Sequence, residues 1–86
     1  MIKTMVIFVV TKNGFYEIED FIKNSHSPVW VGEGVLSEKE LSELRESGLD
    51  ITNFNYQIDK EDEAEIFGAI KTIKEHHPGH SIWTEH

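Results

Sequence analysis

Met5-Val6-Ile7-Phe8-Val9-Val10 is the longest uninterrupted run of apolar residues in this chain of 86 residues. A strand with one solvated face alternates apolar and polar residues, whereas a strand buried on both faces does not. The run therefore predicts a central strand of a sheet that is covered on both sides. Ligands of such sheets bind beyond the carboxyl ends of the strands, so the loop Thr11–Gly14 is the first segment to consider for a site.

The rest of the chain alternates between helical and extended patterns. Helical spacing is found over 15–24, from Ser37 to Gly48, and from Asp59 to a stop at Pro78-Gly79, while short strands are expected at 29–31, 51–56 and 81–84. This order predicts a single α/β domain over 1–86, with three layers and the element order β-α-β-α-β-α-β. We expect a four-stranded, mainly parallel sheet in the order 2-1-3-4, with the first helix on one face and the other two on the opposite face.

The second helix has the clearest boundaries. Ser37 and Glu40 have the spacing of a capping box, in which each side chain accepts a hydrogen bond from the other residue's backbone. At the other end, Gly48 has the residue type preferred just after a helix, and Leu44 and Leu49 have the spacing of a Schellman motif. Both ends of this helix are therefore predicted from local sequence.

The segment of the first helix has two possible assignments, because Asn13-Gly14 after a strand is also a two-residue hairpin signal. A hairpin would change the fold to a mixed α+β sheet. The stripe formed by Phe15, Ile18, Phe21 and Ile22 favours a helix that begins at Asn13 or Gly14, and the hairpin is the alternative.

Composition restricts the function. Sixteen acidic residues against eight basic ones give a net charge of −8, which disfavours nucleic acids and anionic membrane surfaces as partners. No segment approaches the roughly 20 apolar residues of a membrane span, and no signal peptide is recognisable. The absence of cysteine excludes thiol chemistry and fits a cytoplasmic protein. No cofactor motif is present, so no cofactor is expected.

Several polar residues follow the predicted strands and are candidates for binding a ligand at the carboxyl rim of the sheet. They are Thr11, Lys12, Asn13, Glu33, Gln57 and Asp59. Backbone N–H groups at a helix start, together with Lys12, suit an anion, but the loop has neither phosphate-binding glycine motif. Glu33 and Asp59 together suit Mg²⁺. The structural alternative is that these residues only form turns, caps and a solvated acidic rim.

Four histidines gather near the carboxyl end of the chain: His76, His77, His80 and His86. Imidazole binds zinc, but adjacent residues on a helix point about 100° apart, and cationic side chains are favoured at a helix end for electrostatic reasons. No metal site is assigned. Trp83 lies in the terminal strand, where an aromatic residue belongs either to the core or to an interface.

Two functional hypotheses remain. The first is a small acidic protein that acts as a non-enzymatic protein-binding or regulatory module, with a homodimer formed through a sheet edge as one form of it. The alternative is a small-molecule- or metal-binding enzyme or sensor that uses the rim loops. The absence of any catalytic constellation favours the first.

Overall fold

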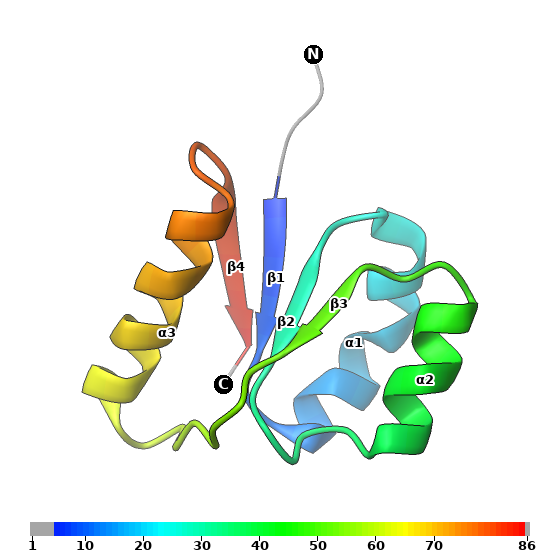
Figure 1. Cartoon of the computed structure of the whole chain (residues 1–86), viewed down its shortest axis with the longest axis horizontal. Helices are drawn as coiled ribbons and strands as arrows, with labels where there is room; N and C mark the ends of the chain where they lie inside the picture. The colour runs from blue at the N-terminus through cyan, green and yellow to red at the C-terminus, as the bar shows by residue number, and fades with distance from the viewer. Residues whose placement is uncertain (1–4, 86) are drawn as a thin grey trace.

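The computed structural model describes residues 5–85; the predicted roles of Met1–Thr4 and His86 therefore lie outside the described residues. Four strands and three helices alternate along the chain (Figure 1). They are β1 (Met5–Val9), α1 (Lys12–Ser25), β2 (Val29–Val31), α2 (Glu38–Glu46), β3 (Ile51–Asn53), α3 (Glu63–His76) and β4 (Ser81–Glu85). The predicted α/β class and element order are confirmed. None of the helices within 5–85 is long and apolar enough to cross a membrane.

The sheet is parallel throughout, and its strand order is 3-2-1-4. β1 is internal, as predicted, but its neighbours are β2 and β4, so the expected order 2-1-3-4 is corrected. The reason lies in burial. All three residues of β2 are buried, as an internal strand requires, whereas Thr52 and Asn53 of β3 are only half-buried, which suits an edge.

The order 3-2-1-4 also changes the distribution of the helices. α1 and α2 lie on one face of the sheet and α3 lies on the other (Figure 1). We had expected α2 to share a face with α3. Because β1, β2 and β3 follow one another in one direction across the sheet, right-handed crossovers place α1 and α2 on the same face.

β1 separates the two halves of the core. Ile7 and Val9 pack with residues of α1 and α2, while Val6, Phe8 and Val10 pack with residues of α3. Residues 6–9 have no solvent exposure, which explains why this strand contains no polar residue. The sequence pattern thus reflects cover on both faces.

α1 begins earlier than expected, and the hairpin alternative is excluded. Thr11 has extended backbone angles and accepts a hydrogen bond from the N–H of Gly14, so it is the N-cap. The helix therefore includes Lys12, Asn13 and Gly14, which had been considered as a turn or a cap.

The predicted boundaries of α2 are confirmed. Ser37 and Glu40 form the complete capping box. After the helix, the N–H of Leu49 donates to the carbonyl of Leu44, and the N–H of Gly48 donates to that of Arg45. These two bonds, with φ of 98° at Gly48, form a Schellman motif.

The N-cap of α3 is Asp62, three residues after Asp59, from which the helical spacing had been expected to start. The Asp62 carboxylate accepts hydrogen bonds from the N–H groups of Ala64 and Glu65. Asp59 accepts instead from the N–H of Glu61, in a turn that precedes the helix. Asp59 and Asp62 are both suited to accept backbone N–H groups at the start of a helix, and the side chain of Asp59 stabilises the preceding turn instead.

Candidate functional site

The strand order reverses between β1 and β4: from β1 the chain first progresses across the sheet toward β2 and β3, and it then returns through α3 to β4 on the other side of β1. In open parallel sheets, a crevice for ligands forms at the carboxyl ends of such a strand pair. Here Thr11 follows β1 and Glu85 ends β4, and the N–H of Val10 donates to the Glu85 carbonyl at 3.0 Å. These two residues define the position where the fold favours a site.

Glu85 occupies that position with its own side chain. The Thr11 hydroxyl lies 3.0 and 3.1 Å from the two Glu85 carboxylate oxygens, to which it donates. A Cβ atom on Gly14 would overlap the Glu85 carboxyl group, so the carboxylate lies directly against the first turn of α1. The negative charge at the start of this helix, which the dipole favours, is therefore supplied by the protein itself.

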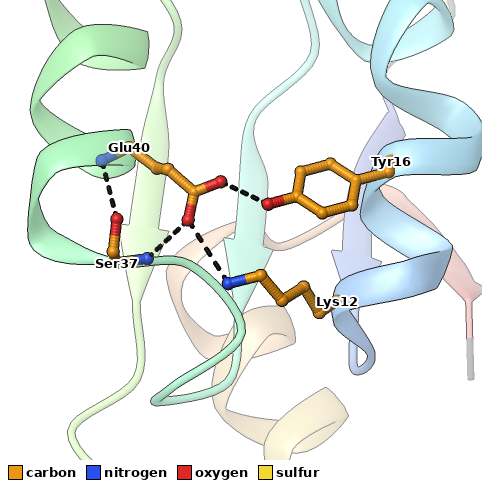
Figure 2. Close-up of polar contacts among 4 residues, drawn as sticks. All are labelled: Lys12, Tyr16, Ser37 and Glu40. Atoms are coloured by element: carbon orange, nitrogen blue, oxygen red, sulfur yellow. Dashed lines mark hydrogen bonds and ion pairs between the residues drawn. The ribbon is translucent and has the colours of Figure 1, made fainter.

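Lys12 belongs to a second network of side chains, which connects the amino-terminal turns of α1 and α2 (Figure 2). Its Nζ lies 3.5 Å from a carboxylate oxygen of Glu40. The same carboxylate accepts hydrogen bonds from the backbone N–H of Ser37 at 2.9 Å and from the Tyr16 hydroxyl at 2.5 Å. One acidic side chain thus caps its own helix and binds two side chains of the neighbouring one.

This network changes two pKa values. The backbone N–H of Ser37 is the main cause that lowers the pKa of Glu40 to about 2, and the Tyr16 hydroxyl and Lys12 add to it. The hydrogen bond to Glu40 raises the pKa of the Tyr16 hydroxyl above its usual 10.0. Both shifts favour the pair in which Glu40 is ionised and Tyr16 is protonated.

The other candidates lie in separate surroundings. Asn13 is exposed on α1. The Glu33 carboxylate accepts from the Asn53 amide at 2.9 Å, the Gln57 side chain lies near Gly34, and Asp59 belongs to the turn before α3. Within residues 5–85, no hydrogen bond or ion pair joins any two of the six predicted rim residues.

Two of the predicted cluster of histidines, His76 and His77, pack against Trp30. The Trp30 indole N–H donates to Nε2 of His77 at 3.3 Å, and the ring of His76 lies 5.3 Å from that of Trp30. His80 lies 5.2 Å from His77, ring to ring. In the part of the chain that is described, no three His, Asp or Glu side chains are placed to hold a metal ion.

A groove of about 650 Å³ runs between α1 and α2. Phe15, Leu44 and Leu49 contribute apolar surface to it. Its polar lining includes the side chains of Glu19, Lys23, His26, Glu40, Glu43 and Asp50. Sequence reasoning had directed attention to the rim of the sheet and missed this groove, because its lining comes from two helices and the segments that follow them, which become neighbours only in the folded chain.

β4 forms one edge of the sheet and, within residues 5–85, pairs only with β1. Glu85 faces β1, since its carbonyl accepts from Val10. Successive residues of a strand direct their N–H and C=O groups to opposite edges, so those of Ile82 and Thr84 point outward. This edge is available to a further strand.

Two aromatic side chains flank the same edge. Trp83 is 42% exposed and Phe21 of α1 is 49% exposed, and their ring centroids are 6.3 Å apart. Exposed aromatic pairs on a protein surface are typical of interfaces. Of the two, Trp83 had been noted from sequence, whereas Phe21 had been counted with the apolar stripe of α1.

The opposite edge of the sheet is protected. Arg45 of α2 donates from Nε and Nη2 to the carbonyl of Ile51 in β3, at 3.3 and 3.2 Å. A charged side chain that occupies an outward carbonyl prevents another strand from pairing there. Among residues 5–85, the β3 edge therefore has an outward carbonyl occupied by Arg45, whereas the β4 edge combines open backbone groups with exposed aromatic surface.

No protein-family model, no curated protein and no solved structure matches this chain.

Proposed function

We propose that this chain is a non-enzymatic protein-binding module that adds an extended segment of a partner protein to the β4 edge. The observation that supports the proposal is the combination of outward backbone groups at Ile82 and Thr84 with the exposed pair Phe21 and Trp83. In strand addition, main-chain hydrogen bonds provide affinity and neighbouring side-chain surfaces provide specificity.

The charge of the chain indicates the chemistry of the partner. The net charge is −8, and Glu17 and Asp20 are exposed on α1 close in sequence to Phe21. A basic segment is attracted by this surface, whereas a second copy of the chain brings the same negative charge and is repelled. The partner segment we propose is extended and basic, with apolar side chains that cover Trp83 and Phe21.

Synthetic peptides of about eight residues, in which valine alternates with lysine, test the proposal as probes. Binding is measured by fluorescence anisotropy of labelled peptide with wild type, Thr84→Pro and Thr84→Val. Proline removes the outward N–H of Thr84 without removing a bond to β1. Valine removes only the hydroxyl and is the matched control.

We expect at least one peptide to bind wild type and Thr84→Val equally, and Thr84→Pro at least about tenfold more weakly. Equal binding by all three proteins would contradict strand addition at this edge. The edge could instead pair with a second copy of the chain, and sedimentation of the protein alone, which measures its oligomeric state, tests this. A dimer that dissociates in the Thr84→Pro variant would assign the β4 edge to a second copy.

A further inference from the structure

We propose that the groove between α1 and α2 binds a linear polyamine, a flexible hydrocarbon chain that carries several ammonium groups. This site is distinct from the β4 edge. α1 forms one wall of the groove and also carries Phe21, but α2, which forms the other wall, lies over β3 at the opposite edge of the sheet. The volume of about 650 Å³ falls within the range of roughly 300–1,000 Å³ that is usual for small-molecule sites.

The charge of the lining selects a cation. Four carboxylates and one lysine line the groove, with His26 at the end of α1. Glu19 is paired with Lys23 at 2.9 Å, and Glu40 is held by Ser37, Tyr16 and Lys12. The carboxylates of Glu43 and Asp50 form no hydrogen bond or ion pair with other residues of 5–85, so two negative charges remain available to a ligand.

The apolar part of the lining selects a cation with a hydrocarbon chain. Phe15 and Leu44 are buried beneath the groove and Leu49 is half-buried. Methylene groups laid along the accessible part of this lining, mainly Leu49 because Phe15 and Leu44 are buried, lose contact with water, which favours binding in proportion to the apolar area covered. A hydrated metal ion gains nothing from such a surface.

Tyr16 adds an aromatic surface at one end. Its side chain is 48% exposed, and the hydrogen bond to Glu40 holds the ring in place at the groove (Figure 2). The face of an aromatic ring attracts ammonium groups. The carboxylates of Glu43 and Asp50 lie further along, since Glu43 is ~4.5 Å beyond Glu40 on the helix axis and Asp50 follows the helix. Negative groups are thus distributed along the groove, as an elongated ligand with several charges requires.

Calorimetric titration with spermine, together with NMR shift mapping, tests the proposal. We expect saturable binding of one molecule per chain, with shift changes centred on Tyr16, Glu43 and Gly48. The double variant Glu43→Gln/Asp50→Asn should weaken binding at least about fivefold, because two charge contacts are lost. Tyr16→Ala should weaken it further, while Tyr16→Phe, which keeps the ring, should weaken it less.

The matched control is Glu61→Gln/Glu75→Gln, which makes the same change of charge at two exposed residues outside the groove lining. If this control weakens spermine binding as much as the groove variant does, the attraction is a diffuse effect of charge and the proposal is overturned. Absence of spermine binding, or NMR shift changes centred outside the groove, would also overturn it. A lysine hexapeptide that binds the groove more tightly than spermine would reject the small-molecule class. Thr84→Pro should leave spermine binding unchanged, which separates this result from the test of the β4 edge.

Discussion

At the scale of single residues, the position after β1 is determined by contacts within the chain. The Glu85 carboxylate lies against Gly14 and accepts from Thr11, so the glycine provides space for a carboxylate from the other end of the sequence. Gly14 has no positive φ, so its conformation alone does not require glycine. Glycine is required at this position because the Glu85 carboxylate lies where a Cβ atom would be.

A double-mutant cycle tests this contact. Gly14→Ala displaces the Glu85 carboxylate and its charge-assisted hydrogen bond, so we expect the free energy of unfolding to fall by about 1 kcal/mol. In a Glu85→Ala background the same change should raise it by about 0.5–1 kcal/mol, because alanine favours helix over glycine. Chemical denaturation of the four proteins measures both values. Equal effects in the two backgrounds would show that the residues are not in contact.

The dependence of stability on pH tests the network around Glu40. The pKa of Glu40 in the folded protein is about 2, below its usual 4.5, so the ionised form stabilises the fold. This contribution is complete above pH 4.5 and is lost as the pH falls toward 2.

Glu40→Gln should therefore cost about 1 kcal/mol of unfolding free energy near neutral pH, since the carboxylate caps a helix but is 31% exposed. The difference from wild type should shrink in acid. Tyr16→Phe removes one cause of the lowered pKa and should move the acid-sensitive range upward. A difference between wild type and Glu40→Gln that does not depend on pH would contradict the assignment.

At the scale of elements, local signals determine α2 and the bounds of β2, and they fail at the start of α3 and at the end of β3. Ser37, Glu40 and Gly48 have roles that depend on their near neighbours in sequence, so they could be assigned before the structure. The cap of α3 could not, because Asp59 and Asp62 present the same signal and a turn uses one of them. β3 was predicted to continue to Tyr56, but the strand ends at Asn53, and the Tyr56 carbonyl accepts from Glu33 instead.

Two glycines give a matched test of the end of α2. Gly48 has φ of 98°, a conformation that costs a residue with a Cβ atom about 1–2 kcal/mol. Gly48→Ala should therefore lower the unfolding free energy by about 1 kcal/mol. Gly68 lies within α3 with open space around it, so Gly68→Ala should raise stability by about 0.5–1 kcal/mol. Thermal unfolding of both variants shows whether each substitution lowers or raises stability. Stabilisation by Gly48→Ala would rule out the left-handed conformation at this helix end.

At the scale of the whole molecule, strand order determines which surfaces are open. The sequence supports β1 as an internal strand, but the choice between β3 and β4 as its second neighbour depends on burial that no local pattern expresses. The same limit applies to the candidate site: the sequence shows single residues but not which strands bring them together. From sequence, Trp83 was assigned either to the core or to an interface. Its contact with Phe21 and the crevice filled by Glu85 both depend on β4 lying beside β1.

The same arrangement gives the molecule one protected and one open sheet edge. Arg45 occupies an outward carbonyl of β3, and no described strand covers β4. Together with a net charge of −8, this asymmetry supports binding of a basic segment at β4 as the function we propose.

Amide hydrogen exchange at β4, with and without a bound valine–lysine peptide, tests this claim most directly. Strand addition predicts that the outward N–H groups of Ile82 and Thr84 exchange quickly in the free protein and become protected when the peptide binds, while the N–H of Glu85 is already protected through β1. If a peptide binds and the exchange of Ile82 and Thr84 does not change, the β4 edge is not the binding site.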